Sequence, residues 1–248
     1  MCTVTFYPTD SGYILTHNRD EMPLRSPIAL SVKKESLKTM IYPQDQQAHG
    51  TWIFIQSKGV TACLINGAYE NHTKRSSYRM SRGIVMLHLA QCNHVASWIK
   101  TYDLDQIEPF TLIILQDQEL IELIWDGSEK HIRYLGMRIP TIWSSTTLYS
   151  EEHSHLRKQL FYQWIDRIKD YDPAAWMYRF HEAGTVGDIR NNIRMYRQGG
   201  PRTVSTTQVI ADGNSVHMLY HDLIHDSKTT AQFKVKKINT QNRKLLHV

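Results

Sequence analysis

The sequence has few of the features that define several large classes of protein. Its 248 residues include only three cysteines, Cys2, Cys63 and Cys92, at wide spacings and without a CxxC pair. An odd number of widely spaced cysteines favours neither a disulfide framework nor a zinc knuckle. No apolar run approaches the ~20 residues that cross a bilayer, and no charged leader followed by an apolar segment precedes the first strand-like stretch. We therefore expect a soluble, cytoplasmic protein with no membrane span.

Phosphate-binding and metal-binding motifs are also scarce. The glycines of GTVGDIRNN and RQGGPR lack the spacing of a phosphate-binding loop. His221 and His225 are four residues apart, but no HExxH motif and no third ligand accompany them. We expect no metal and no cofactor.

The positive charge does not point clearly to a nucleic acid. The net charge is +5 and the pI is about 9.0, yet the lysines and arginines are scattered along the chain. Nucleic-acid binders usually gather such residues on one face. We expect no nucleic-acid partner and keep this function as the last alternative. The arginines of the segment 190–202 leave open a loop that gates a pocket for an anionic ligand.

Alternating apolar residues predict strands in three groups along the chain. The segments 3–8 and 13–18 flank a DSG turn, which is typical of a β-hairpin. The other strands are expected at 51–56, 60–66, 110–116, 119–126, 131–136, 203–211, 215–222 and 232–238.

Helices are predicted between these groups of strands. Ser81 is expected to cap a helix over 81–91, and Asn93 a second one that ends near residue 102. An apolar stripe, Leu156, Leu160, Phe161, Trp164, Ile165 and Ile168, predicts a long helix over 151–170. Asp172 and Pro173 begin a fourth helix. Strands and helix pairs segregated in this way favour an α+β layered architecture, and no linker divides the single domain expected over 1–248.

The position of Cys2 suggests a chemistry that an interior cysteine lacks. Removal of Met1 would give Cys2 a free α-amine, with a pKa of about 7.7–8.0, beside a thiol with a pKa near 8.5. The amine can take the thiol proton while the sulfur attacks a carbonyl, and it can then protonate the leaving amine. The outer ends of a hairpin lie side by side, so THNRDE should place His17 to Asp20 near Cys2. Asp20 is then the expected partner of the α-ammonium, and Arg19 a group that lowers the thiol pKa or binds a carboxylate.

Several short motifs resemble one family when they are taken in order. MCT at the start, NRDE at 18–21, GTW at 50–52, LIN at 64–66, SRG at 81–83 and RTVSTTQVIADG at 202–213 together resemble the NRDE-motif family, also called the transport and Golgi organisation protein 2 family. That family resembles the N-terminal nucleophile hydrolases, which implies a four-layer αββα sandwich with two antiparallel sheets. A similar start occurs in bile salt hydrolases and penicillin V acylases, which cleave linear amides.

The resemblance implies a set of site residues. Cys2 would be the nucleophile, Asp20 and Arg19 would hold the terminus, and Asn66 would donate a hydrogen bond to the oxyanion. Ser145 stands where acylases have an amide donor, and its hydroxyl has one hydrogen bond to give. His17 stands where acylases have an arginine, Asn18 lies beside it, and Arg202 matches their late arginine. These four residues are the expected substrate contacts.

Two functions of different classes follow. The first is a cofactor-independent hydrolase of a carbon–nitrogen bond, acting on a small amide or acyl substrate. The resemblance also implies an alternative, a non-catalytic carrier or trafficking factor for haem or acyl lipids, in which His17 or Cys2 contacts the ligand.

Overall fold

Two antiparallel sheets form the centre of the molecule. The computed structural model of the protein describes residues 2–24, 28–35, 38–168 and 172–234. The first sheet has six strands in the spatial order β10 (Thr141–Ser144), β1 (Cys2–Thr9), β2 (Gly12–Glu21), β11 (Arg202–Ala211), β12 (Ser215–Asp222) and β13 (Ser227–Lys234). The second has seven, in chain order: β3 (Ile28–Glu35), β4 (Lys38–Gln44), β5 (Ile53–Gln56), β6 (Thr61–Asn66), β7 (Phe110–Gln116), β8 (Glu119–Trp125) and β9 (Lys130–Leu135).

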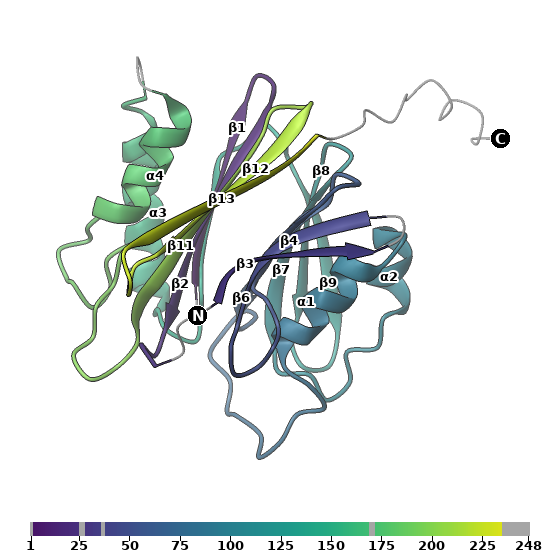
Figure 1. Ribbon diagram of the computed structural model, residues 1–248. Helices are drawn as coiled ribbons and strands as arrows, with labels where there is room; N and C mark the ends of the chain where they lie inside the picture. The colour runs from purple at the N-terminus through teal and green to yellow at the C-terminus, as the bar shows by residue number, and fades with distance from the viewer. Residues whose placement is uncertain (1, 25–27, 36–37, 169–171, 235–248) are drawn as a thin grey trace.

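Two pairs of helices cover the outer faces of the sheets. Helices α3 (Glu151–Ile165) and α4 (Pro173–Ala183) pack on the first sheet, and α1 (Arg82–Gln91) packs on β5 and β6 of the second. Figure 1 shows α1 and α2 (Val95–Thr101) beside the second sheet, with α3 and α4 on the opposite side of the molecule. The layers therefore run helix, sheet, sheet, helix. This arrangement confirms the expected four-layer αββα sandwich.

The alternation of side chains along β2 explains how the layers are joined. Tyr13 and Leu15 belong to the large hydrophobic core that includes residues of both sheets, whereas Ile14 belongs to a second cluster with residues of α3 and α4. Successive residues of a strand point to opposite faces of a sheet. The same alternation decides the surroundings of the NRDE residues at the end of β2.

Most predicted elements are present, with corrections at some ends. Asp172 caps α4 through Ala174 N, and Ser81 is the N-cap of α1. The second helix has His94 as its N-cap, so the prediction of Asn93 was wrong by one residue, a usual uncertainty at helix ends. The helix predicted over 151–170 ends at Ile165, and the last strand begins at Ser227 instead of residue 232. Residues 169–170 and 235–238 of these two predictions lie outside the described residues.

The sequence analysis missed three strands, β3, β4 and β10. Of these, β3 contains four charged or polar residues and lies at the edge of its sheet, and β10 has only four half-buried residues. The stripe predicted for α3 also needs correction, because Leu156 is 39% exposed while Arg157 is fully buried. The helix is rotated so that Arg157 and Phe161, which are four residues apart on one face, are its buried residues.

Candidate functional site

Cys2 begins β1 and lies on the wall of a cavity. It is directly opposite Arg19 in the antiparallel pair of β1 and β2, and its carbonyl oxygen accepts a hydrogen bond of 3.0 Å from Ser145 N. Residues directly opposite each other share a face of the sheet. The cavity has a volume of about 230 Å³ and receives Cys2, Arg19 and Glu21 from the first sheet and Leu64 and Asn66 from the second. Met1 lies outside the described residues.

The rest of the cavity wall is mostly polar. It comes from the segment between β4 and β5, the loop after β6, the beginning of α1 and the residue before Pro109, and it consists of Asp45, Ala48, Gly50, Thr51, Trp52, Lys74, Ser81, Arg82, Gly83 and Glu108. Arg82 forms an ion pair of 3.0 Å with Glu108 and donates to the carbonyl oxygen of Pro109. These contacts tie the beginning of α1 to the segment before β7 in the cavity wall.

Arg19 is held by several groups of this wall. Its guanidinium pairs with the carboxylate of Asp45, lies 3.7 Å from that of Glu21 and stacks 4.4 Å above the ring of Trp52. The Asp45 side chain also accepts hydrogen bonds from the backbone N–H groups of two residues in its own turn. Arg19 is therefore a rigid cationic part of the cavity wall opposite Cys2.

The Cys2 thiol is neutral in this environment. Its burial raises the pKa above the ordinary value, the charge of Asp20 acts in the same direction, and the charge of Arg19 opposes both. A thiol whose pKa is raised reacts slowly at neutral pH unless a base removes its proton. Any nucleophilic role of Cys2 thus requires a base close to its sulfur.

Asp20 faces the helices rather than the cavity. Its carboxylate accepts a hydrogen bond of 2.9 Å from Tyr149 OH and another of 2.7 Å from the hydroxyl of Thr203. Burial raises the pKa of Asp20, whereas the nearby Arg157 charge and the Thr203 hydrogen bond lower it. Arg19 and Asp20 are adjacent in sequence, but the alternation of β2 places them on opposite faces.

Asn66 and Ser145 are joined by a hydrogen bond. Asn66 is the last residue of β6 and lines the cavity. The Ser145 hydroxyl donates to the carbonyl oxygen of Asn66 at 2.7 Å, and its oxygen lies 2.9 Å from the Thr147 hydroxyl. Ser145 is fully buried and lies outside the cavity lining. In this arrangement it supports the backbone of Asn66.

The three other predicted substrate contacts also lie outside this cavity lining. His17 is buried between the sheets, where one ring nitrogen lies 3.2 Å from the carbonyl oxygen of Leu64, and burial lowers its pKa to about 4. Asn18 donates to the carbonyl oxygens of His181 and Ile193 at 3.0 Å. Arg202 lines a separate pocket of about 190 Å³, with residues 22–24, 196–197 and 199–200.

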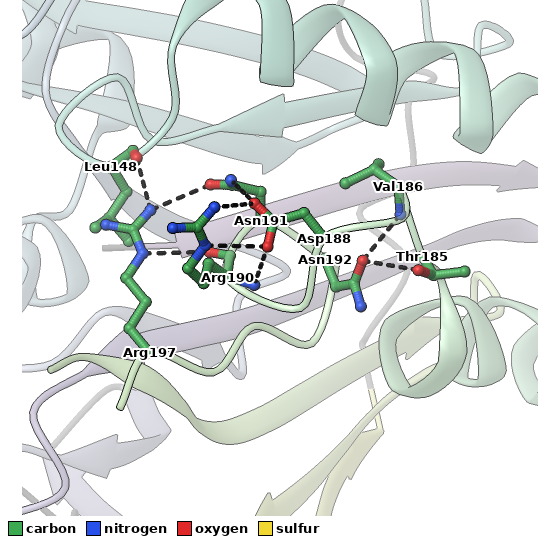
Figure 2. A network of polar contacts seen from close by, with 8 residues as sticks. All are labelled: Leu148, Thr185, Val186, Asp188, Arg190, Asn191, Asn192 and Arg197. Carbon is green, nitrogen blue, oxygen red and sulfur yellow. Dashed lines mark hydrogen bonds and ion pairs between the residues drawn. The ribbon is translucent and has the colours of Figure 1, made fainter. Parts of the chain in front are cut away.

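The arginines of the segment 190–202 were considered as a gate for an anionic ligand. Arg190 instead pairs with Asp188, and Arg197 donates to the carbonyl oxygens of Leu148 and Arg190 and to the side chain of Asn191. Figure 2 shows these contacts within the loop, together with those of Asn192. Arg190 and Arg197 therefore stabilise the loop, and neither lines the cavity of Cys2.

The histidines hold other side chains in place. His221 contacts Tyr178 OH at 2.6 Å and Asp226 at 3.1 Å, and His225 pairs with Asp222. Across the described ranges, no group of three or more His, Cys, Asp and Glu side chains is arranged to hold a metal ion. Nor does any helix within those ranges have the length and apolar character of a membrane span.

Sequence reasoning missed Tyr149, Arg157 and Asp45. Tyr149 donates a hydrogen bond to the NRDE strand from a residue more than 120 positions away, and the charge of Arg157 acts on that strand at Asp20. Asp45 lies in a turn between two strands. No local pattern marks any of the three, since strand and helix periodicity report burial and not long-range partners.

Comparison with known proteins places the chain in a structural context. The sequence pattern of the transport and Golgi organisation 2 family matches residues 1–173. No curated protein matches the chain in sequence. An orthologue of N-acylethanolamine-hydrolysing acid amidase from Caenorhabditis elegans has a similar structure, with a TM-score of 0.57 and 12% identity over 86% of this chain and 93% of that one. A mutant conjugated bile acid hydrolase from Clostridium perfringens gives a TM-score of 0.48 and 12% identity over 96% and 98% of the two chains. The fold is that of the N-terminal nucleophile hydrolases, as the sequence predicted.

Proposed function

The chain belongs to the transport and Golgi organisation 2 family, and we propose that it is a cysteine-type N-terminal nucleophile hydrolase that cleaves a linear amide bond once Met1 is removed. The observation that carries the proposal is the place of Cys2, at the start of β1 and on the wall of a polar cavity. The nematode amidase shares the fold, which supports the same class of reaction on a small substrate.

The neutral thiol explains why the free amine matters. Burial raises the pKa of the Cys2 thiol, so the sulfur needs a base, and the α-amine of a terminal Cys2 titrates near pH 8. The amine takes the thiol proton as the sulfur attacks the amide carbonyl. The same proton passes to the leaving amine as the carbon–nitrogen bond breaks. Water then hydrolyses the thioester and restores the thiol.

The surrounding groups have separate roles in this mechanism. Asp20 holds the α-ammonium from the helix side of β2. Arg19 is the fixed cation opposite Cys2 and orients the substrate or stabilises negative charge on it. Asn66 donates to the oxyanion from the end of β6, where a preorganised donor stabilises the developing charge. Ser145 keeps Asn66 in place through its hydrogen bond to the Asn66 carbonyl oxygen.

The cavity limits what it can enclose. Its volume of about 230 Å³ lies below the 300–1,000 Å³ that is usual for drug-sized ligands, so it fits the scissile amide and a few neighbouring atoms. The remainder of a larger substrate would extend along the open side. Since the nematode relative is named for hydrolysing N-acylethanolamines, these amides are the first to test, followed by N-acyl amino acids and short acyl amides.

The experiment begins with the intact mass of the protein purified from cells. Limiting iodoacetamide is then added, and the labelled cysteine is located by peptide mapping. We expect Met1 to be absent and Cys2 to be labelled before Cys63 and Cys92. Amide hydrolysis is measured next for the wild type, Cys2→Ala and Cys2→Ser, with Cys92→Ala as the control because Cys92 is a free, half-buried cysteine outside the cavity.

The outcomes separate the hydrolase from a carrier. Loss of turnover in both Cys2 variants, with Cys92→Ala fully active, supports the proposal. A protein that keeps Met1, or a Cys2→Ala variant that retains full turnover, contradicts it.

A further inference from the structure

Arg157 is a fully buried cation in the helix layer beside the candidate site. It belongs to α3, and its guanidinium stacks 3.8 Å from the ring centre of Tyr149. One of its terminal nitrogens donates to the Thr3 hydroxyl at 2.6 Å and to the carbonyl oxygen of Asn192 at 3.1 Å. Burying a charge is unfavourable unless an opposite charge and hydrogen bonds compensate for it. A buried arginine of this kind therefore needs a reason in the structure.

The Arg157 charge acts on the carboxylate of Asp20. Tyr149 connects the two groups, since it stacks on the guanidinium and donates through its hydroxyl to Asp20. Thr203 donates to the other carboxylate oxygen. Tyr149 and Thr203 thus both donate to the Asp20 carboxylate. Hydrogen bonds donated to a carboxylate favour its ionised form.

Arg157 also contacts the strand of the nucleophile. Thr3, its hydrogen-bond partner, directly follows Cys2 in β1. The guanidinium thus touches the residue after the nucleophile on one side and, through Tyr149, the NRDE strand on the other. A displacement of Arg157 would be transmitted to both.

The loop in Figure 2 holds this assembly from outside. Arg197 donates to the carbonyl oxygen of Leu148, the residue before Tyr149. The carbonyl oxygen of Asn192 accepts a hydrogen bond from Arg157. Asn192 is fixed in turn, because its side-chain oxygen accepts from Val186 N and from the Thr185 hydroxyl. The loop therefore orients the Tyr149 backbone and one side of the guanidinium.

We propose that Arg157 is a positioning residue of the site: its charge and its contact with Tyr149 hold the Asp20 carboxylate where it can bind the α-ammonium of Cys2. The inference deepens the proposed function and rests on it, because only a terminal Cys2 amine needs that carboxylate. Arg157, a buried side chain of α3, thereby takes part in the chemistry of Cys2 at the start of β1.

Other charged and titratable groups near Asp20 must be considered in any test by pH. On β1 and β2 they are Cys2, Arg19 and His17, and α4 contributes His181, whose pKa is lowered by burial and by the charges of His17 and Arg157. Since His17 and His181 titrate below the ordinary histidine range, their titration can overlap that of a carboxylate. The readout therefore has to report Asp20 alone.

The direct measurement is the titration of the Asp20 carboxyl carbon by NMR in protein labelled with ¹³C-aspartate, with Asp20→Asn to assign the signal. Arg157→Met removes the charge, Arg157→Lys keeps it, and Tyr149→Phe removes only the hydroxyl. Tyr162→Phe is the matched control, because Tyr162 lies on α3 and donates to the carbonyl oxygen of Pro140 instead. Circular dichroism checks that each variant is folded, and Arg157→Gln replaces Arg157→Met if the latter is not.

We expect the pKa of Asp20 to rise by about one unit or more in the uncharged Arg157 variant, as is typical when a nearby opposite charge is lost. The rise should be smaller in Tyr149→Phe, smaller still in Arg157→Lys, and absent in Tyr162→Phe. An Asp20 pKa that is unchanged both in Tyr149→Phe and in a folded, uncharged Arg157 variant overturns the inference.

The rate of Cys2 alkylation against pH supplies the link to the site. In protein without Met1, loss of the Arg157 charge should displace this profile along the pH axis, and Asp20→Asn should abolish any further effect of the Arg157 change. Additive effects of the two changes would contradict a role through Asp20. These readouts do not depend on turnover, so a protein that shows them but hydrolyses no amide contradicts the proposed hydrolysis and not the assignment of Arg157.

Discussion

The backbones of Gly50 and Gly83 are in contact on the wall of the Cys2 cavity. A β-carbon placed on Gly50 would lie 2.4 Å from the carbonyl carbon of Gly83, and the carbonyl oxygen of Gly83 accepts a hydrogen bond of 3.1 Å from Thr51 N. Gly50 begins the GTW motif and Gly83 ends the SRG motif. Two motifs that are about thirty residues apart in sequence therefore meet at the site because neither glycine has a side chain to separate them.

This contact predicts a clear effect of Gly50→Ala. Because the new methyl group would meet backbone atoms, which cannot move aside like a flexible side chain, we expect a loss of about 1–3 kcal/mol in the free energy of unfolding. The beginning of α1 should shift with it and change the rate of Cys2 alkylation. Urea unfolding and timed iodoacetamide labelling measure the two effects.

Gly200→Ala is the matched control for this substitution. A β-carbon at Gly200 would have its nearest neighbour at 3.5 Å, an ordinary contact distance. We expect its unfolding free energy to stay within about 0.5 kcal/mol of the wild type. Equal stability of the two variants would show that the glycine contact does not restrict the cavity wall.

Much of the fold could be predicted because its strands carry their own signals. The segments 110–116 and 119–126 were predicted almost to the residue as β7 and β8, since long apolar runs bounded by a short turn have few other interpretations. The strand β10 gave no comparable signal. It has only four residues, and its pairing with β1 joins segments more than 130 positions apart in sequence.

Only the part of the site that the β1–β2 hairpin positions could be predicted from the sequence. Pairing of β1 with β2 placed Arg19 opposite Cys2, as the DSG turn implied. The period of two along a strand also means that Arg19 and Asp20 face different layers, which the expectation of a joint role did not take into account. Tyr149, in the segment before α3, donates to Asp20, and Arg157 of α3 stacks on Tyr149. No local pattern in the sequence encodes these contacts.

Gly67 offers a second test at the end of β6. Its φ is +91°, and a β-carbon there would lie 2.2 Å from the hydroxyl oxygen of Thr146, next to Ser145. We expect Gly67→Ala to lower the unfolding free energy and to disturb the hydrogen bond from Ser145 to Asn66. Turnover of an identified amide should fall more than stability alone explains, because Asn66 is the proposed oxyanion donor.

Gly187→Ala separates backbone strain from steric overlap. Gly187 has a φ of +86°, but a β-carbon there would meet nothing within 4 Å. Both substitutions introduce the left-handed strain of about 1–2 kcal/mol, and only Gly67→Ala adds the overlap. We therefore expect Gly67→Ala to be the less stable by roughly 1–3 kcal/mol. Similar stability and similar activity of the two variants would contradict the role given to Gly67.

Asp45→Asn tests the cation opposite Cys2. Asn keeps an oxygen for the N–H groups of Gln47 and Ala48 but loses the charge that pairs with Arg19. Because removing one partner of a buried ion pair leaves the other uncompensated, we expect a loss of about 1–3 kcal/mol, reduced by the Glu21 carboxylate at 3.7 Å. Chemical denaturation provides the measurement. Glu21→Gln should have the smaller effect, and the reverse order would show that Glu21 is the main partner of Arg19.

His17 predicts a loss of stability in acid. Its pKa falls from the ordinary 6.5 to about 4 because burial disfavours the charged ring. A group whose pKa is lowered in the folded state stabilises that state above its unfolded pKa, and this contribution disappears as the pH falls through the folded value. Between pH 7 and pH 5 the contribution of His17 to the free energy of unfolding should decrease by roughly 2 kcal/mol.

His17→Gln, which does not titrate and retains a donor for the Leu64 carbonyl oxygen, should lose that much less stability over this range. Urea unfolding at the two pH values measures the difference, with His217→Gln as the control because His217 is exposed on β12. If the pH dependence is the same in His17→Gln and the wild type, the ring is already charged in the folded protein at pH 5, which contradicts the lowered pKa of His17.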